Sequence, residues 1–119
     1  MKIASRERAE PFTTLDGSTI RVLLDARLGG AHNQSLAEAT LGPGQATRRH
    51  HHAETEEIYV VLAGEGDMEV DGEQSRVATG DAILILPGAW HQLRADESGE
   101  LRILCCCAPP YRDEDTFFG

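Results

Sequence analysis

Turn-forming residues recur along this sequence at short, even intervals, and this spacing limits how long any helix or strand can be. Glycine, proline and aspartate favour the tight backbone conformations of turns. Between them lie short segments rich in valine, isoleucine, leucine and threonine, and no long segment has helical periodicity. This pattern is typical of an all-β sandwich or barrel. The turn signals are Asp16-Gly17, Gly29-Gly30, Gly42-Pro43-Gly44, Gly64-Glu65-Gly66, Asp71-Gly72, Gly80-Asp81, Pro87-Gly88 and Ser98-Gly99.

The same pattern predicts where the strands lie. Apolar residues favour strands over 19–24, 35–41, 46–52, 58–63, 66–70, 74–78, 82–86, 91–95 and 101–107. The Asp71-Gly72 pair predicts a two-residue hairpin turn, because both residues tolerate the positive φ that such a turn needs. We expect residues 1–12 to form an N-terminal arm and residues 109–119 a C-terminal tail of a single domain spanning 1–119.

Composition and charge narrow the class of protein. The chain has 119 residues, of which 40% are hydrophobic, and this is enough for one core. No apolar run is long enough to span a bilayer, and the first residues lack the apolar segment of a secretion signal, so we expect a cytoplasmic protein without a membrane partner. The formal net charge of −9 argues against a nucleic-acid partner, because phosphate backbones favour clustered lysine and arginine.

Three consecutive cysteines, Cys105, Cys106 and Cys107, do not form the framework of a secreted disulfide protein. In a strand, Cys105 and Cys107 share one face and Cys106 points to the other. They lack the paired C-x-x-C spacing of a soft metal site. We therefore expect small buried apolar side chains rather than a metal or redox site.

A histidine-rich segment carries the strongest sign of chemistry. In a strand, His50 and His52 project to the same face while His51 points to the opposite one. Two imidazoles on one face can bind the same ion, and a carboxylate from the next strand with a fourth group from a distant one would complete the site.

The spacing around these histidines resembles the first motif of the cupin superfamily, G-x5-H-x-H-x4-E-x6-G. An alternative spacing, with three residues before the acid, would choose Glu56 and put Ala63 at the last glycine position. The longer spacing fits every position of the motif and therefore favours Glu57. The matching residues are Gly44, His50, His52, Glu57 and Gly64.

The second cupin motif, G-x5-P-x-G-x2-H-x3-N, is matched in part. Gly80, Gly88 and His91 fit it, whereas Leu86 and Ala95 stand where proline and asparagine are usual. Together the two motifs cover nearly half of the chain. The chain is thus similar to small single-domain cupins of the conserved-barrel type. This resemblance implies a β-barrel of the jelly-roll, or double-stranded β-helix, kind.

The resemblance also implies a metal site. Its ligands would be His50, His52, Glu57 and His91, which present three imidazole nitrogens and one carboxylate. Such a mixed set suits one divalent transition metal, Fe, Mn, Ni, Cu, Co or Zn, and does not select among them. With four protein ligands, an octahedral ion keeps two positions open for water, substrate or dioxygen, as in a reactive site.

Strand alternation suggests which residues line a pocket beside this site. If His50 faces the interior, so does Arg48, about two residue rises or roughly 7 Å away. Its guanidinium could bind a substrate carboxylate or phosphate. The alternative is that Arg48 lies at the barrel mouth and pairs with Glu54 or Glu56.

Two further residues share a face with the predicted ligands. Tyr59 alternates with Glu57 and could act catalytically as a proton donor or contact the substrate, or it could be a core aromatic residue. Leu93 lies on the face of His91 and would make an apolar substrate-binding wall. Trp90 immediately precedes His91 and should point away from it.

For function, the resemblance implies a metal-binding protein with a small-molecule ligand or substrate. The leading hypothesis is a metal-dependent enzyme, with dioxygenase as the first choice, acting on a small and possibly anionic organic molecule. The alternatives are a non-catalytic cupin that binds a sugar or carboxylate, and a sugar isomerase or epimerase. A homodimer is also expected from the resemblance, and pairing would hide the strand edges of an open barrel.

Overall fold

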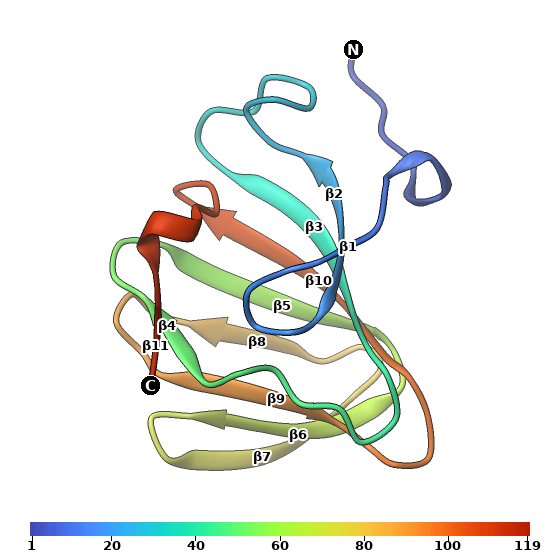
Figure 1. The fold of residues 1–119 in the computed structure, drawn as a ribbon, viewed down its shortest axis with the longest axis vertical. Coiled ribbons are helices and arrows are strands. Elements are labelled where there is room, and N and C mark those ends of the chain that lie inside the picture. The colour runs from blue at the N-terminus through green and yellow to red at the C-terminus, as the bar shows by residue number, and fades with distance from the viewer.

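The turn-rich sequence folds into short antiparallel strands arranged in two sheets (Figure 1). This computed structural model describes residues 1–119. The six-stranded sheet has the spatial order β1 (Phe12–Thr13), β2 (Thr19–Leu24), β3 (Ser35–Leu41), β10 (Leu101–Ala108), β5 (Glu56–Ala63) and β8 (Ala82–Ile85). The five-stranded sheet has the order β11 (Thr116–Phe118), β4 (His50–His52), β9 (His91–Ala95), β6 (Glu65–Val70) and β7 (Glu73–Ala78).

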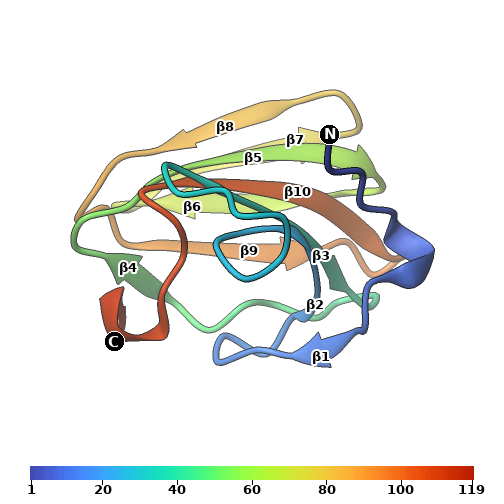
Figure 2. The same cartoon turned by 90° about the horizontal axis from the view of Figure 1, so that it is seen from above.

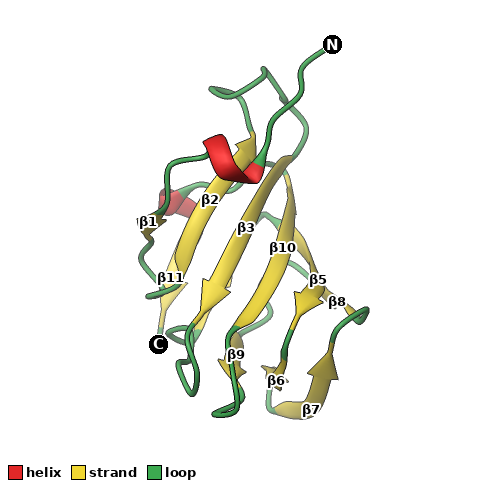
Figure 3. Ribbon diagram, turned by 90° about the vertical axis from the view of Figure 1, so that its right-hand side faces the viewer, coloured by secondary structure: helices red, strands yellow, loops and turns green.

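The predicted all-β class and jelly-roll fold are confirmed, but the predicted barrel is not closed. Strands β2, β3, β10 and β5 lie side by side in Figure 3, and Figure 2 shows the two sheets from above. Each sheet is hydrogen-bonded within itself, and no strand ladder joins one sheet to the other. The fold is therefore two facing sheets connected by loops, not a closed barrel.

Sharp connections carry the chain from one sheet to the other. Between β5 and β6 the chain turns at Gly64, whose φ is +87°. A Cβ atom at this position would collide with the carbonyl oxygen of Glu100. Only glycine fits both the backbone conformation and the close approach, which gives a physical reason for the last glycine of the first motif.

The predicted hairpin forms at Asp71 and Gly72. Their φ angles are 49° and 87°, and the turn joins β6 to β7 with Val70 paired to Glu73. Positive φ at both central residues is the mark of a type I′ turn, which matches the right-handed twist of the flanking strands. The remaining strand predictions lie within one or two residues of the observed bounds, with one exception.

The exception is the strand predicted over 46–52, which is reduced to β4 (His50–His52) with an isolated bridge at Ala46. Before β4 the backbone bonds elsewhere. The N–H of Thr47 donates to the carbonyl of Leu93, and the N–H of Arg48 donates to the carbonyl of Asp16. A regular ladder is therefore interrupted here, and strict alternation of side chains is lost.

Both chain ends contain regular structure. The segment expected as a tail contains a short 3-10 helix, η2 (Asp113–Asp115), followed by β11, which pairs antiparallel with β4. The segment expected as an arm contains η1 (Arg6–Arg8) and ends where β1 begins. The C-terminal strand thus covers the edge of the strand that carries two of the predicted metal ligands.

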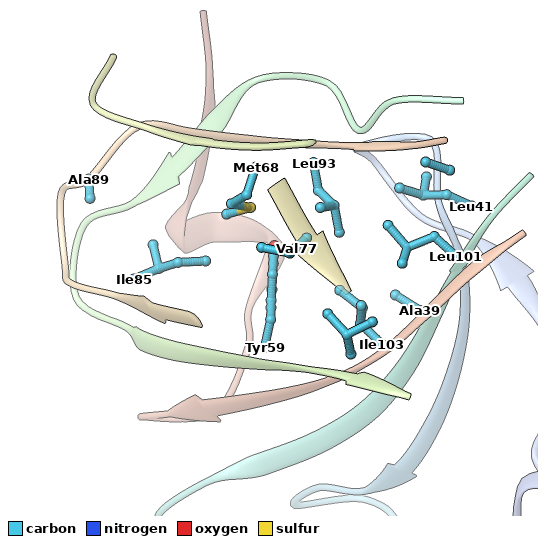
Figure 4. Packing of buried hydrophobic residues seen from close by; sticks show 12 residues of the cluster. Ala39, Leu41, Tyr59, Met68, Val77, Ile85, Ala89, Leu93, Leu101 and Ile103 are labelled. Carbon is cyan, nitrogen blue, oxygen red and sulfur yellow. The ribbon is translucent and has the colours of Figure 1, made fainter. Parts of the chain in front are cut away.

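The hydrophobic core lies between the sheets. Figure 4 shows Met68 and Leu93 of one sheet pointing towards Tyr59 and Ile103 of the other. All four side chains are buried. The full cluster is Ala39, Leu41, Tyr59, Val61, Met68, Val77, Ile85, Ala89, Leu93, Ala95, Leu101 and Ile103.

Neither of the two short helical segments could cross a membrane, being neither long enough nor apolar enough.

Candidate metal centre

Three histidines converge on the inner face of the five-stranded sheet. His50 and His52 come from β4, and His91 lies directly opposite His50 on β9. The ring centroids of His50 and His91 are 4.2 Å apart, and each residue offers a ligand atom within 4.8 Å of the others. All three side chains are buried, so the chain places three histidines where they can hold a metal ion.

Backbone carbonyls orient the three imidazole rings. The Nδ1 atom of His50 lies 2.7 Å from the carbonyl oxygen of Arg48, and that of His91 lies 2.9 Å from the carbonyl oxygen of Ala89. The Nδ1 atom of His52 lies 3.2 Å from the carbonyl oxygen of Asp115. Because a carbonyl can only accept, Nδ1 donates in each case, and Nε2 keeps the lone pair that a metal needs.

Glu57 reaches the histidines from the opposite sheet. Its Oε1 atom lies 3.4 Å from Nε2 of His52 and 3.5 Å from Nε2 of His91. Oε1 of Glu57 and Nε2 of His91 are both buried and have no hydrogen-bond partner. Buried polar atoms are rarely left unpaired, and a divalent cation between them would satisfy both. The donor set therefore fits a transition metal, and no other group of the chain bonds to these two atoms.

The electrostatics of the cluster keep the carboxylate ionised. Burial alone would raise the pKa of Glu57, but the close approach of the His52 and His91 imidazoles outweighs burial and lowers the pKa to about 2. Burial and the proximity of His91 lower the pKa of His50. For His52 burial acts in the same direction, yet the contacts with Glu57 outweigh it and raise the pKa. An ionised carboxylate among imidazoles is the protonation state that binds cations.

A cysteine positions the carboxylate from behind. Cys107 of β10 is the register partner of Glu57, and its thiol donates to Oε2 at 3.2 Å. Burial and the charge of Glu57 raise the pKa of this thiol, so it remains protonated and can donate. As predicted, Cys105 and Cys107 share the inner face, whereas Cys106 contacts Gln34 elsewhere. Strand alternation predicts which face Cys107 occupies, but it does not predict that Glu57 is its hydrogen-bond partner.

The C-terminal segment supports the site in a way that sequence reasoning missed. The buried carboxylate of Asp115 accepts hydrogen bonds from the backbone N–H groups of Ala53, Glu54 and Thr55, at 3.1–3.2 Å. Burial would raise the pKa of Asp115, but these bonds outweigh it and lower the pKa. This carboxylate fixes the turn that connects the histidine strand β4 to β5, the strand of Glu57. In the sequence it stands in an acidic cluster without any local signal of burial.

A pocket opens beside the histidines, between the two sheets. The space between the atoms there, including open solvent at its mouth, is about 820 Å³. His50, His52 and Glu57 line one end of it. The predicted pocket residues Tyr59 and Leu93 also line it, and the Tyr59 ring centroid lies 6.1 Å from that of His91.

Arg48 does not take the inward position that strand alternation predicts. Its side chain is exposed, is absent from the pocket lining, and places its guanidinium carbon 4.2 Å from the ring centroid of Phe118. Thr47 is the buried residue that lines the pocket instead, because the strand is interrupted before His50. The alternative, an ion pair between Arg48 and Glu54, does not form. Glu54 instead pairs with Arg112, whose guanidinium nitrogen lies 3.0 Å from the Glu54 carboxylate.

Trp90 points away from the ligands, as predicted. Its ring packs against His51 on the outer face, with centroids 4.3 Å apart, and His51 in turn stacks on Phe117 at 5.2 Å. His51 therefore belongs to a surface aromatic cluster and not to the metal centre.

The facing sheets and the buried histidine cluster define a small β-protein with a candidate metal centre between its sheets. A family model described as "Cupin domain" matches residues 37–107. This chain belongs to the cupin family, and the match confirms the resemblance seen in the two motifs.

Similar proteins cover nearly the whole chain. An uncharacterized protein of Methanocaldococcus jannaschii, MJ1618, is 43% identical over 118 residues, which are 98% of this chain and 94% of that protein. Among solved structures, Streptomyces Pac13 with uridine has a TM-score of 0.82 at 15% identity and covers 100% of this chain and 90% of its own. Pac13 is described as a nucleoside dehydratase.

A second structural neighbour is a predicted oxalate decarboxylase from Thermotoga maritima. Its TM-score is 0.79 at 20% identity, over 90% of this chain and 98% of that chain. At these identities the likeness to solved structures concerns the fold, which hosts many activities.

Proposed function

We propose that this protein is a metal-dependent enzyme acting on a small organic molecule, with His50, His52, Glu57 and His91 as the ligands of one divalent transition metal. The observation that carries the proposal is the pair of unpartnered buried atoms, Glu57 Oε1 and His91 Nε2, beside a pocket between the two sheets. When bound, a divalent ion would supply Lewis-acid chemistry by polarising an oxygen atom of the ligand.

The surrounding residues have distinct roles in this proposal. The thiol of Cys107 holds Oε2 of Glu57, so that Oε1 is directed at the histidines. Burial and the charge of Glu57 raise the pKa of Tyr59, so its hydroxyl stays protonated and can donate a hydrogen bond to a ligand oxygen. Leu93 makes an apolar wall that helps to exclude water.

Dioxygenase chemistry is the subclass to test first. Protein reconstituted separately with Fe²⁺, Mn²⁺, Ni²⁺ and Cu²⁺ is supplied with a panel of phenols, diketones and thiols while oxygen uptake is recorded. We expect uptake with at least one metal and one substrate, and its loss in His50→Ala. If every combination leaves oxygen unchanged although the metal is bound, the dioxygenase assignment is wrong.

A non-catalytic ligand-binding protein, or a sugar isomerase or epimerase, is the alternative. The binding role is favoured because no acid–base pair accompanies the metal ligands: Tyr59 is held neutral, and the carboxylate of Glu57 faces the histidines. An isomerase or epimerase would need such a pair. Ligand binding that persists without turnover would support the binding role, and recovery of an altered ligand would contradict it.

A cytoplasmic location is part of the proposal, and the three free cysteines suit a reducing compartment.

A homodimer is supported by apolar side chains on the outer face of the six-stranded sheet. Ile58 and Leu84 are register partners on β5 and β8 and are 39% and 56% exposed, and Leu86 beside them is 55% exposed. Contiguous exposed apolar residues mark association surfaces. We expect Leu84→Glu to convert a dimer into a monomer in sedimentation equilibrium at micromolar concentration. A wild-type mass equal to that of one chain would contradict this.

A further inference from the structure

Strand register builds the floor of the pocket in parallel rows across the six-stranded sheet. Next to the row that contains Glu57 and Cys107 lies a row in which Val22, Ala37, Cys105 and Tyr59 are successive partners. The following row pairs Ile20 with Ala39 and Ala39 with Ile103. Apart from the tyrosine hydroxyl, these two rows offer only apolar groups and a thiol. The floor therefore becomes more apolar with distance from the histidines.

Small side chains on β3 create the space. Ala37 and Ala39 line the pocket where the neighbouring strands carry larger residues. Figure 4 shows Ala39, Ile103, Leu101 and Leu41 gathered at one end of the interior. Fourteen of the 23 lining residues are hydrophobic. The two rows on the six-stranded sheet favour a ligand whose body is largely apolar, because apart from the Tyr59 hydroxyl and the Cys105 thiol they offer no partner to polar groups.

Away from the metal ligands, the charged side chains that line the pocket are all acidic. No lysine or arginine lines it, and its carboxylates besides Glu57 are Asp16 and Asp25. Oδ1 of Asp16 accepts from the N–H and hydroxyl of Ser18, and Oδ1 of Asp25 accepts from the N–H of Leu28. Neither carboxylate has a cationic partner. An anionic group on the ligand body would meet repulsion and no compensating charge.

We propose that the pocket takes a small molecule with an uncharged, largely apolar body, one end of which reaches the metal. Ala37 sets the size of that body. This assignment rests on the proposed metal site, and it differs from the anionic ligand that the expected inward position of Arg48 suggested.

Hydroxamic acids test the assignment, because one chelating group can carry different bodies. Cobalt-loaded protein is titrated with acetohydroxamic acid, benzohydroxamic acid, 4-carboxybenzohydroxamic acid and the methyl ester of the last, and the visible spectrum of cobalt reports binding. We expect benzohydroxamic acid to bind about tenfold more tightly than acetohydroxamic acid. We expect the carboxylate to bind about tenfold more weakly than its ester.

Variants of Ala37 locate the effect. Ala37→Phe is expected to abolish the preference for the aromatic body while cobalt content and acetohydroxamic acid binding are retained. Thr40→Phe is the matched control, because it adds a phenyl group on the same strand but outside the pocket lining, and it should bind as wild type does. Ala37→Leu gives the same test with a smaller side chain if the phenylalanine variant does not fold.

The outcomes separate this assignment from the metal site. If cobalt does not bind, the proposed function and the assignment both fail. If cobalt binds but the carboxylate is preferred over its ester, the assignment alone is overturned, and loss of that preference in Arg48→Met would identify an anion site. Equal binding of the acetyl and benzoyl compounds would also overturn it.

Discussion

Replacing His50 with alanine is expected to reduce the bound divalent metal from about one equivalent per chain to less than about a tenth. Loss of a residue that only orients a metal ligand costs roughly 10–100-fold in affinity, and loss of a ligand itself should cost at least about 100-fold. The buried Nε2 atoms of His52 and His91 cannot close the gap, because backbone carbonyls fix their rings. Elemental analysis of untagged protein, dialysed against trace chelator, measures the effect.

The matched control is His51→Ala. This histidine is adjacent in sequence but packs against Trp90 and Phe117 on the outer face. It should therefore retain about one equivalent of metal. Metal addition should raise the thermal midpoint of wild type and His51→Ala but not of His50→Ala, since binding stabilises only the state that binds. Equal metal content in both variants, or no metal in wild type after reconstitution, would contradict the proposed ligand set.

The contrast between His50 and His51 explains why much of the fold and the core of the site could be predicted. Turn residues and the two-residue alternation of strand side chains depend on local sequence, so turns and strand faces can be predicted from the sequence. The motif glycines can be recognised for the same reason. Gly64 has both the backbone conformation and the close contact that exclude other residues. The convergence of His50, His52 and His91 follows from two strands with regular alternation.

The prediction that Arg48 points inward is wrong, because side-chain alternation holds only along an unbroken strand. Thr47 bonds to Leu93 through both its backbone N–H and its hydroxyl, and this interrupts the ladder just before β4. A sequence cannot show such a long-range interruption. The same limit applies to Cys107 and Asp115, since their roles depend on which segments pair across 50 or more residues of chain.

Replacing Asp115 with alanine is the second change with a large expected effect, this time on stability. The variant removes the acceptor of three backbone N–H groups, those of Ala53, Glu54 and Thr55, and the last of these residues is buried. Hydrogen bonds to a charged acceptor contribute roughly 1.5–3 kcal/mol, and a buried donor left unpaired adds its own desolvation cost. We expect a loss of about 3 kcal/mol in the free energy of unfolding, measured by urea denaturation of the metal-free protein.

Glu114→Ala is the matched control, because Glu114 lies in the same turn of η2 but is exposed. It should change the free energy of unfolding by less than about 0.5 kcal/mol. Asp115→Asn should be intermediate, since its amide oxygen keeps part of the acceptor role without the charge. The carbonyl of Asp115 also orients His52, so a displaced η2 should weaken metal binding together with stability. If Asp115→Ala were as stable as Glu114→Ala, the C-terminal segment would be dispensable for the turn between β4 and β5, and the support it gives to the histidine strand would have to come from β11 alone.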